Sequence, residues 1–537
     1  MNARTTIIAL VITCALAAVA FLVFQGGSLK RVGAGVIAGS RGGSVPLALP
    51  QWYQQLSVTQ ADQLQVKHID GSSTLIARDP HLRSLMIEKW PIQESTADAA
   101  LRLISQAVPT TRKAPSKGSL AHVEVTLNGQ HVLRLHPQSL GGGVVVSLDE
   151  LDMALDCDPR LISLFEPQAM LAWRSPAALP FLSQGNSGVP SLEQVKVLSL
   201  DAPGKVVQLE RRGRSWRVGK LGYGQTESCE SLLQMLGTIK VIRFIGPPDS
   251  IALNWIEIPK ATITVDSDLR QLVAPALRDA GSTQLRVRTL RQELRLGGSA
   301  DGTGKHILAH SVGYWIDDTN VLTPAYGPMV VVIESQSVGA LNLDRLGYVS
   351  QSPLPPAILP VADITSLYLG DELTQEQLEN SAAPMLASAE SLKQPGSALN
   401  RIVLRRTLDG WKTFESPASA SQPAADESAG KPMNKAAIKS LLDVLTSERA
   451  SERASEKANE KSTTQISDVA PPGIKPVGTL VVATARGPQE ILYIASRDER
   501  NGARQLCIRV AGLYYLFSEK VSEPVLSFMR EIMPTQG

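Results

Sequence analysis

The sequence predicts an α+β protein that repeats one small unit about three times behind a single N-terminal transmembrane helix. The first observation is internal similarity: Val144–Asp158 matches Val330–Asp344 without gaps at six of fifteen positions. The second is that Val207–Trp216 (VQLERRGRSW) resembles Ile402–Trp411 (IVLRRTLDGW), and a Ser-Leu-Leu-x-x-Leu segment follows each. Recurrence of this kind is typical of repeated supersecondary units.

Each predicted unit begins with a strand in which apolar and polar residues alternate. These strands are Leu64–Ile69, Val195–Leu200 and Ile364–Leu369. Alternation with a period of two indicates a half-buried strand. Two further strands and a helix are expected after each, and in the middle unit the apolar residues between 232 and 239 fall on one helix face.

Strands are expected to resume behind each helix. In the first unit Asn128-Gly129 separates two alternating runs, which is a strong hairpin signal. In the second unit Gly298–Lys305 (GSADGTGK) resembles a phosphate-binding loop. Its glycine spacing is wrong, and it joins two strands instead of opening a helix, so we predict a hairpin loop.

These signals divide the chain into an anchor, a stalk and three units, with extra material in the last unit. The predicted limits are 1–25 for the anchor, 26–55 for the flexible stalk, 56–190, 191–358 and 359–537 for the units, 415–431 for a low-complexity insertion and 447–462 for a charged repeat.

The predicted anchor is Thr5–Phe24, an uncharged and almost wholly apolar segment long enough to span a bilayer. A cleaved signal peptide, ending at small residues near Ala17 or Ala20, is the alternative, and a buried helix is a third. Lys30, Arg31 and Arg41 follow the anchor, against the usual charge bias. Because no second long apolar run exists, we expect a single-pass inner-membrane protein whose body faces the periplasm or the outside.

Composition excludes several function classes. A net charge of +2 gives no footprint for nucleic acid, and no basic stripe with interleaved aromatics occurs. Cys14 lies in the anchor, and the widely spaced Cys157, Cys229 and Cys507 are predicted to be buried thiols instead of a disulfide or zinc set.

One acid-rich run could supply carboxylates for a cation or for hydrolysis. It contains Asp149, Glu150, Asp152, Asp156 and Asp158. In the matching stretch only the last of these has an acidic counterpart, Asp344. Solvated or helix-capping roles are therefore favoured for these acids.

The remaining candidates for chemistry are histidines and tryptophans, and both favour structural roles. The histidines near strands show no metal-binding spacing, and Trp216 and Trp411 are expected in cores; the histidine pairs are His131 with His136 and His306 with His310. The sequence predicts no catalytic residue, no cofactor site and no metal site.

The later two units share an apolar strand, a turn, a tryptophan strand and a leucine-rich helix. Trp216 with Leu232-Leu233-x-x-Leu236, and Trp411 with Leu441-Leu442-x-x-Leu445, carry this pattern. It resembles a bacterial family known as domain of unknown function 4340. The first unit departs from the pattern, because Trp90 directly precedes Pro91. The resemblance implies a membrane segment followed by repeated units, and association with ABC-type transport systems of the gliding-motility kind.

These observations favour a non-catalytic accessory or scaffold protein of the cell envelope that binds protein partners, possibly ABC transporter subunits. The first alternative is a module that binds an envelope polymer such as cell-wall glycan, which would require exposed aromatic side chains. A hydrolase that uses acids in the Asp149–Asp158 run is the third reading. No nucleic-acid partner is expected.

Overall fold

The computed structural model describes the chain from residue 49 to residue 532, with gaps. Nothing is described for 1–48, 116–119, 139–142, 183–193, 214, 249–254, 272–285, 318, 356–358, 371–401, 415–429, 447–464, 485–486, 499–503, 511 and 533–537. The chain divides into a short unit, residues 1–54, and a large unit, residues 55–537. In the short unit the described element is α2 (Gln51–Gln54).

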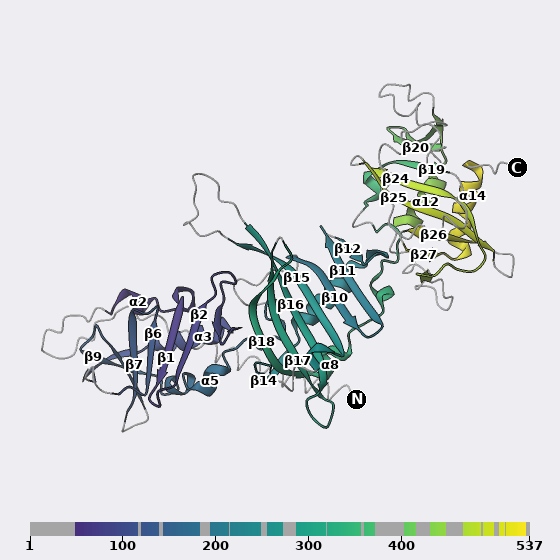
Figure 1. The fold of residues 1–537 in the computed structure, drawn as a ribbon. Coiled ribbons are helices and arrows are strands. Elements are labelled where there is room, and N and C mark those ends of the chain that lie inside the picture. Colours follow the sequence, from purple (N-terminus) through teal and green to yellow (C-terminus); the bar gives the residue numbers. More distant parts are fainter. Residues whose placement is uncertain are drawn as a thin grey trace, which may run out of the picture. The chain divides into compact units, whose positions relative to one another are not determined.

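The large unit contains three antiparallel sheets of nine strands, and all three have the same strand order (Figure 1). In each sheet four strands form a meander, a helix follows, and one strand then goes to the far edge. Four further strands form a second meander beside the first. The order in the first sheet is β4-β3-β2-β1-β6-β7-β8-β9-β5.

The first sheet and its helices are η1 (Val58–Gln60), β1 (Gln63–His68), β2 (Ser73–Arg78), β3 (Leu85–Ile87), β4 (Trp90–Pro91), α3 (Glu94–Ser105), β5 (Val108–Lys113), β6 (Val123–Leu127), β7 (His131–Pro137), β8 (Val144–Leu148), β9 (Met153–Cys157), α4 (Leu161–Leu164) and α5 (Pro167–Leu171). The second set is β10 (Val195–Ala202), β11 (Lys205–Arg212), β12 (Ser215–Val218), β13 (Gly222–Gly224), α6 (Thr226–Gly237), β14 (Val241–Gly246), β15 (Ala261–Gln271), β16 (Arg286–Ser299), β17 (His306–Ile316), β18 (Leu322–Glu334), α8 (Ser335–Gly339) and η4 (Arg345–Tyr348).

The third set is η5 (Val361–Asp363), β19 (Ile364–Gly370), β20 (Ile402–Thr407), β21 (Gly410–Phe414), β22 (Lys431–Pro432), α12 (Lys435–Thr446), β23 (Gln465–Ser467), β24 (Ile474–Thr484), β25 (Gly487–Asp498), β26 (Arg504–Val510), β27 (Leu513–Leu516) and α14 (Glu519–Ile532). The strands predicted at the start of each unit are therefore present as β1, β10 and β19.

The two meanders of each sheet join through their first strands. In the second sheet β10 pairs with β15 and places Leu198 opposite Val265. In the third sheet β19 pairs with β24 and places Leu367 opposite Val482. These four side chains are buried, so in both sheets the strand pair that joins the two meanders also lines the hydrophobic core.

Two turns predicted from sequence are confirmed. Asn128 and Gly129 join β6 to β7, and both have positive φ, 51° and 68°. Positive φ at both central residues defines the turn whose twist matches a hairpin, which explains the Asn-Gly pair. The segment Gly298–Lys305 leads from β16 into β17 and is a hairpin connection, as expected.

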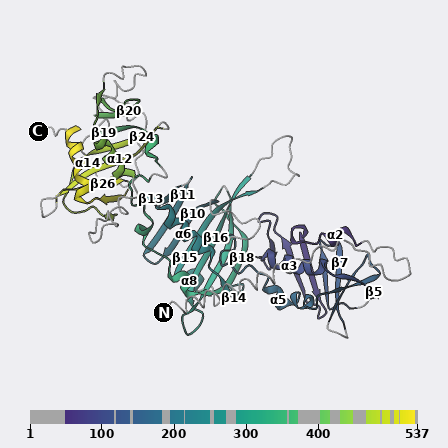
Figure 2. The same cartoon turned by 180° about the vertical axis from the view of Figure 1, so that it is seen from behind.

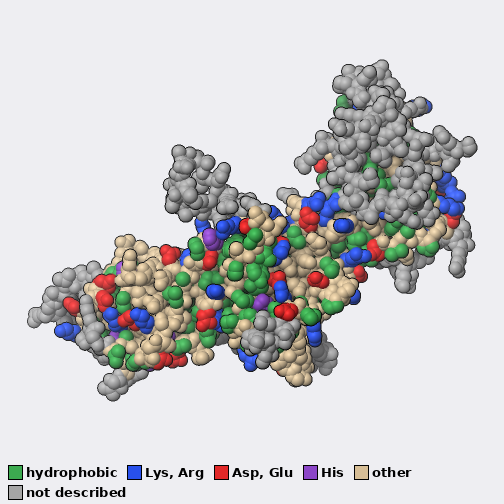
Figure 3. Space-filling model, in the orientation of Figure 1, with side chains coloured by type: hydrophobic (Ala, Val, Ile, Leu, Met, Phe, Trp, Pro, Cys, Tyr) green, Lys and Arg blue, Asp and Glu red, His purple; other side chains and the backbone are tan. Residues whose placement is uncertain are grey.

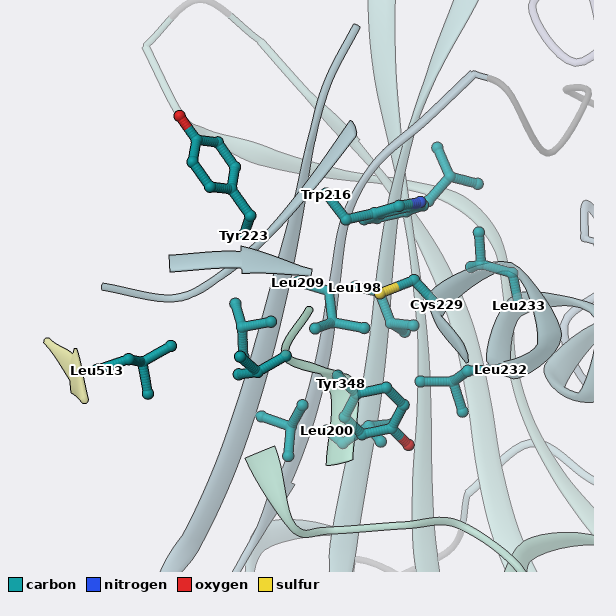
Figure 4. Packing of buried hydrophobic residues seen from close by; sticks show 14 of the residues in the cluster. Leu198, Leu200, Leu209, Trp216, Tyr223, Cys229, Leu232, Leu233, Tyr348 and Leu513 are labelled. Carbon is teal, nitrogen blue, oxygen red and sulfur yellow. The ribbon is translucent and has the colours of Figure 1, made fainter. Parts of the chain in front are cut away.

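Helix α6 supplies the other half of the core of the second sheet. Its residues Cys229, Leu232 and Leu233 point toward Leu198 and Leu209 on the strands (Figure 4). All five side chains are at most 3% exposed. The same helix can be followed from behind in Figure 2, beside β10 and β11.

The predicted α+β fold class is wrong. The structure is mostly antiparallel sheet, with 49% strand against 23% helix. The strands β15 to β18 are long. In β16, charged residues such as Arg291 and Glu293 lie between the buried Leu290 and Leu294, so the strand is longer than its apolar residues alone indicate. The α+β prediction treated the recurring helix as half of each unit, but in the second unit a 12-residue helix accompanies a sheet of nine strands.

The predicted transmembrane helix cannot be placed, because Thr5–Phe24 lies outside the described residues. Among the helices that the structure describes, none is both long and apolar enough to cross a membrane. Most of the low-complexity insertion and the whole charged repeat also fall outside the described residues.

The two sequence similarities differ in structural meaning. The tryptophan segments Val207–Trp216 and Ile402–Trp411 occupy equivalent strand pairs, β11–β12 and β20–β21. The match of Val144–Asp158 with Val330–Asp344 is not structural: it aligns β8 with the end of β18, and these strands hold different places in their sheets. Short runs of valine are common in buried strands, so two such runs can match in sequence while their strands hold different places in their sheets.

Candidate functional site

The acid-rich run does not form a site. Its carboxylates are split between the two ends of β9, and most form an ion pair or hydrogen bond with a different partner. The pairs are Asp149 with Arg134, Glu150 with His131 at 3.6 Å, Asp156 with Gln138 at 2.9 Å, and Asp158 with Arg160 at 2.7 Å. Four of the five carboxylates therefore have different partners.

Asp158 and its counterpart Asp344 show how local the electrostatics are. The guanidinium of Arg160 donates to Asp158 and lowers the pKa of that carboxyl to about 2. Asp158 also accepts from the backbone N–H of Arg160, and Asp344 accepts from the N–H of Leu346 at the start of η4. Asp344 therefore caps η4, whereas the N-cap of α4 is Arg160 and Asp158 instead stabilises the turn that leads into that helix.

A cavity of about 260 Å³ lies beside the same region. Its lining includes Lys113, Arg134, Ser147 and Asp152. Hydrogen bonding to Asp149 raises the pKa of Arg134, so the strongest cation in the cavity is already engaged. Asp149 therefore holds Arg134 at one wall of the cavity.

The described residues contain no cluster of three or more His, Cys, Asp or Glu side chains suited to a metal ion. His306 interacts with Asp301 in the hairpin loop and lowers the pKa of that carboxyl to about 2. His310 is 5% exposed, and burial lowers the pKa of its ring to about 4. A neutral imidazole is therefore buried against β16.

Paired charged side chains also lie on β15 and β16 of the second sheet. Arg291 donates two hydrogen bonds to Asp266, at 2.8 and 2.7 Å, and Arg295 pairs with Glu293. Bidentate pairing of this kind fixes geometry and uses up both carboxylate oxygens. The Arg291–Asp266 pair joins β16 to β15, the Arg295–Glu293 pair lies along β16, and both carboxylates are paired.

A larger cavity, about 520 Å³, lies beside β2 and β3. Its polar lining includes Arg78, Asp79, Glu88 and Lys89. Arg78 donates to the carbonyls of Val58, Ala61 and Arg83, and Glu88 pairs with Arg174. The arginine thus ties the segment before β1 to β2, which is a structural role that periodicity does not reveal.

Aromatic side chains do not form a binding platform. None of the tryptophan, tyrosine or phenylalanine residues that the structure describes is exposed. Trp216 is fully buried, as predicted, with its indole N–H donating to Glu230 at 3.2 Å and Arg211 stacked 4.5 Å above the ring. Trp411 is only partly buried. Sugars stack on open aromatic faces, so the glycan-binding alternative is not favoured.

The first sheet ends at the edge strand β4, and a later part of the chain pairs with that edge. The N–H of Gln93 donates to the carbonyl of Trp173 at 2.6 Å, and the N–H of Ser175 donates to the carbonyl of Pro91 at 2.7 Å. The pairing is antiparallel. We call Trp173–Ser175 the first edge segment; its three residues are at most 6% exposed.

The second sheet repeats this arrangement at β13. The N–H of Gln225 donates to the carbonyl of Tyr348 at 2.7 Å, and the N–H of Ser350 donates to the carbonyl of Tyr223 at 2.9 Å. We call Tyr348–Ser350 the second edge segment. In both sheets a glutamine at the start of the helix and a residue two positions earlier hold an extended segment in the same register. This recurring geometry is the candidate functional feature of the molecule.

Comparison with known proteins adds no assignment. No protein-family model matches the chain, and neither a curated protein nor a solved structure matches it. The resemblance to the domain of unknown function 4340 family therefore stays a prediction. On the face shown in Figure 3, basic and acidic side chains are interspersed.

Proposed function

We propose that this chain is a non-enzymatic accessory protein of the cell envelope, held in the inner membrane by Thr5–Phe24, whose folded body binds protein partners. The observation that supports it most directly is the repeated use of a sheet edge to hold an extended segment. Adding a strand to an exposed edge is a common mode of peptide recognition, because backbone hydrogen bonds supply the affinity. The separately paired acids favour binding over catalysis.

Subunits of an ABC-type transport system are the first partners to test, as the family resemblance suggests. The test is affinity purification of the tagged full chain from membranes in mild detergent, after brief cross-linking. We expect the same membrane proteins in every replicate. Residues 1–55 carrying the same tag are the control for proteins that bind only the anchor. Repeated recovery of the full chain alone would refute the scaffold function.

The membrane topology is a separate element of this proposal. Reporter fusions after Pro50 and after Gly537 are expected to be active only outside the cytoplasm. If both are active only as cytoplasmic reporters, the body faces the cytosol and the envelope-facing function is wrong.

A further inference from the structure

The third sheet also ends at a short edge strand, β22, and strand pairing shows that it corresponds to β13. In the second sheet Trp216 pairs with Gly224. In the third sheet the N–H of Met433 donates to the carbonyl of Trp411 at 2.9 Å. Met433 therefore corresponds to Gly224, and the residues on either side of it correspond to those that bond an edge segment in the second sheet.

This third edge has no edge segment in the part of the chain that the structure describes. The carbonyl of Pro432 and the N–H of Asn434 have no hydrogen-bond partner there, and both residues are exposed. The corresponding Pro91 and Tyr223 are buried. After the last long meander of the third sheet the chain forms α14, which packs against β26 and α12 instead of pairing with β22.

A proline at this position does not prevent pairing. Pro91 occupies the corresponding place in β4, and its carbonyl accepts from Ser175. Proline lacks only the N–H donor, and the edge segments use the carbonyl of that residue. Pro432 therefore retains the one group that the edge requires.

The start of α12, next to β22, is basic where the corresponding helices are acidic. Lys435 and Lys439 are exposed, and the first turn of α12 has no acidic residue. By contrast, α3 has Glu94 in its first turn and α6 has Glu227. A helix N-terminus carries partial positive charge, which adds to that of the lysines. The edge therefore favours a negatively charged occupant.

We propose that β22 and the start of α12 form a docking edge that binds an extended acidic segment of a partner protein. The segment adds antiparallel to β22: it donates one N–H to the carbonyl of Pro432 and accepts the N–H of Asn434. Its carboxylates are attracted by the positive charge at the start of α12, to which Lys435 and Lys439 contribute. This inference rests on the proposed function and deepens it by naming where one partner binds.

The probe for this site is a fluorescent peptide of alternating valine and glutamate, added to the full chain in mild detergent. Fluorescence anisotropy is expected to show saturable binding. The same peptide N-methylated at alternate amides keeps its charge but loses its donors, so we expect binding about ten-fold weaker or more. Hydrogen exchange should show slower exchange of the Asn434 amide when the unmodified peptide is bound.

The matched variants reverse charge at two places in the third sheet. Lys435→Glu with Lys439→Glu gives the helix start the acidic sign that the other two sheets have, and we expect about ten-fold weaker peptide binding. The control Lys520→Glu makes a change of the same sign at the start of α14, and is expected to leave peptide binding unchanged. Circular dichroism of each variant checks that the sheets remain folded.

Equal binding by the N-methylated peptide would overturn the proposal, as would equal effects of the α12 and α14 variants. Binding that appears only after deletion of residues 416–429 would assign the edge to the acids Asp426 and Glu427 of the chain itself, and would also overturn it. If membrane partners co-purify equally with the Lys435→Glu/Lys439→Glu variant, the docking edge is wrong and the scaffold function stands. If the peptide binds but no partner co-purifies, the docking edge stands and the scaffold function is wrong.

Discussion

Replacing Trp216 and Trp411 by alanine, one at a time, tests whether equivalent positions in two sheets contribute unequally to the free energy of unfolding. Trp216 is fully buried, and its ring contacts Arg211 on one face. A buried aromatic side chain removes about 200 Å² from water, and at about 25 cal/mol per Å² this corresponds to about 5 kcal/mol. Measured losses for such substitutions are about 3–5 kcal/mol, so we expect about 4 kcal/mol for Trp216→Ala.

Trp411 should matter less. It is half-buried at the edge of the core, and position 439, which corresponds to Glu230, is a lysine that cannot accept from the indole N–H. We expect Trp411→Ala to cost about 1–2 kcal/mol, since part of its ring is already in water.

Native-state hydrogen exchange measured by mass spectrometry is the suitable assay, because a chain with several sheets does not unfold in one two-state step. A loss of about 4 kcal/mol should speed amide exchange in β11 and β12 by about a thousand-fold, and a loss of about 1.5 kcal/mol in β20 and β21 by about ten-fold. Equal or larger acceleration in the third sheet would show that burial of the tryptophan does not set its contribution.

Three further predictions concern single buried positions. The folded-state pKa of His310 is about 4, below its ordinary value of 6.5, so the unfolded chain binds the extra proton and stability should fall as pH drops from 6.5 to 4; urea titrations of His310→Leu should lack that slope. A Cβ at Gly313 would lie 2.1 Å from the ring of Tyr326, so Gly313→Ala should cost about 1–3 kcal/mol, seen as a lower urea midpoint. Burial raises the pKa of Cys229 and Cys507 to about 12, and site-resolved mass spectrometry should find both unmodified by iodoacetamide at neutral pH until the protein is denatured; rapid native labelling would contradict this.

Local signals in the sequence predicted local structure well. The alternating run at Val195–Leu200 is β10, and Asn128-Gly129 is a turn with the required positive φ. Both features depend on a few adjacent residues, so periodicity and turn chemistry suffice to identify them. The fold class depends on which strands pair across an intervening helix, as β10 does with β15, and alternation carries no information about that partner.

The candidate feature depends on contacts that no short motif encodes. Gln93 and Trp173 are far apart in the chain, and neither lies in a periodic pattern. The recurring signal becomes visible only when strand pairing aligns Gln93 with Gln225 and shows that a serine two residues after an aromatic residue bonds each edge. Asn434 occupies the third place, where an amide side chain caps α12 by accepting from the N–H of Ala436.

Exposed sheet edges are hazards as well as binding sites, and lysine and proline are residues that proteins place on edges to prevent aggregation. Lys431 and Pro432 of β22, with Lys435 and Lys439 at the start of α12, fit that protective role, so it must be distinguished from docking. If protection is the purpose, Lys435→Ala with Lys439→Ala should increase light scattering of the purified chain while leaving peptide affinity unchanged. If the edge is a docking site, the same variant should bind the valine–glutamate peptide several-fold more weakly, since two favourable charge pairs are lost, without added scattering. Burial of Pro91 under Ser175 in the first sheet favours docking, because an edge with proline at this position is already paired in the same molecule.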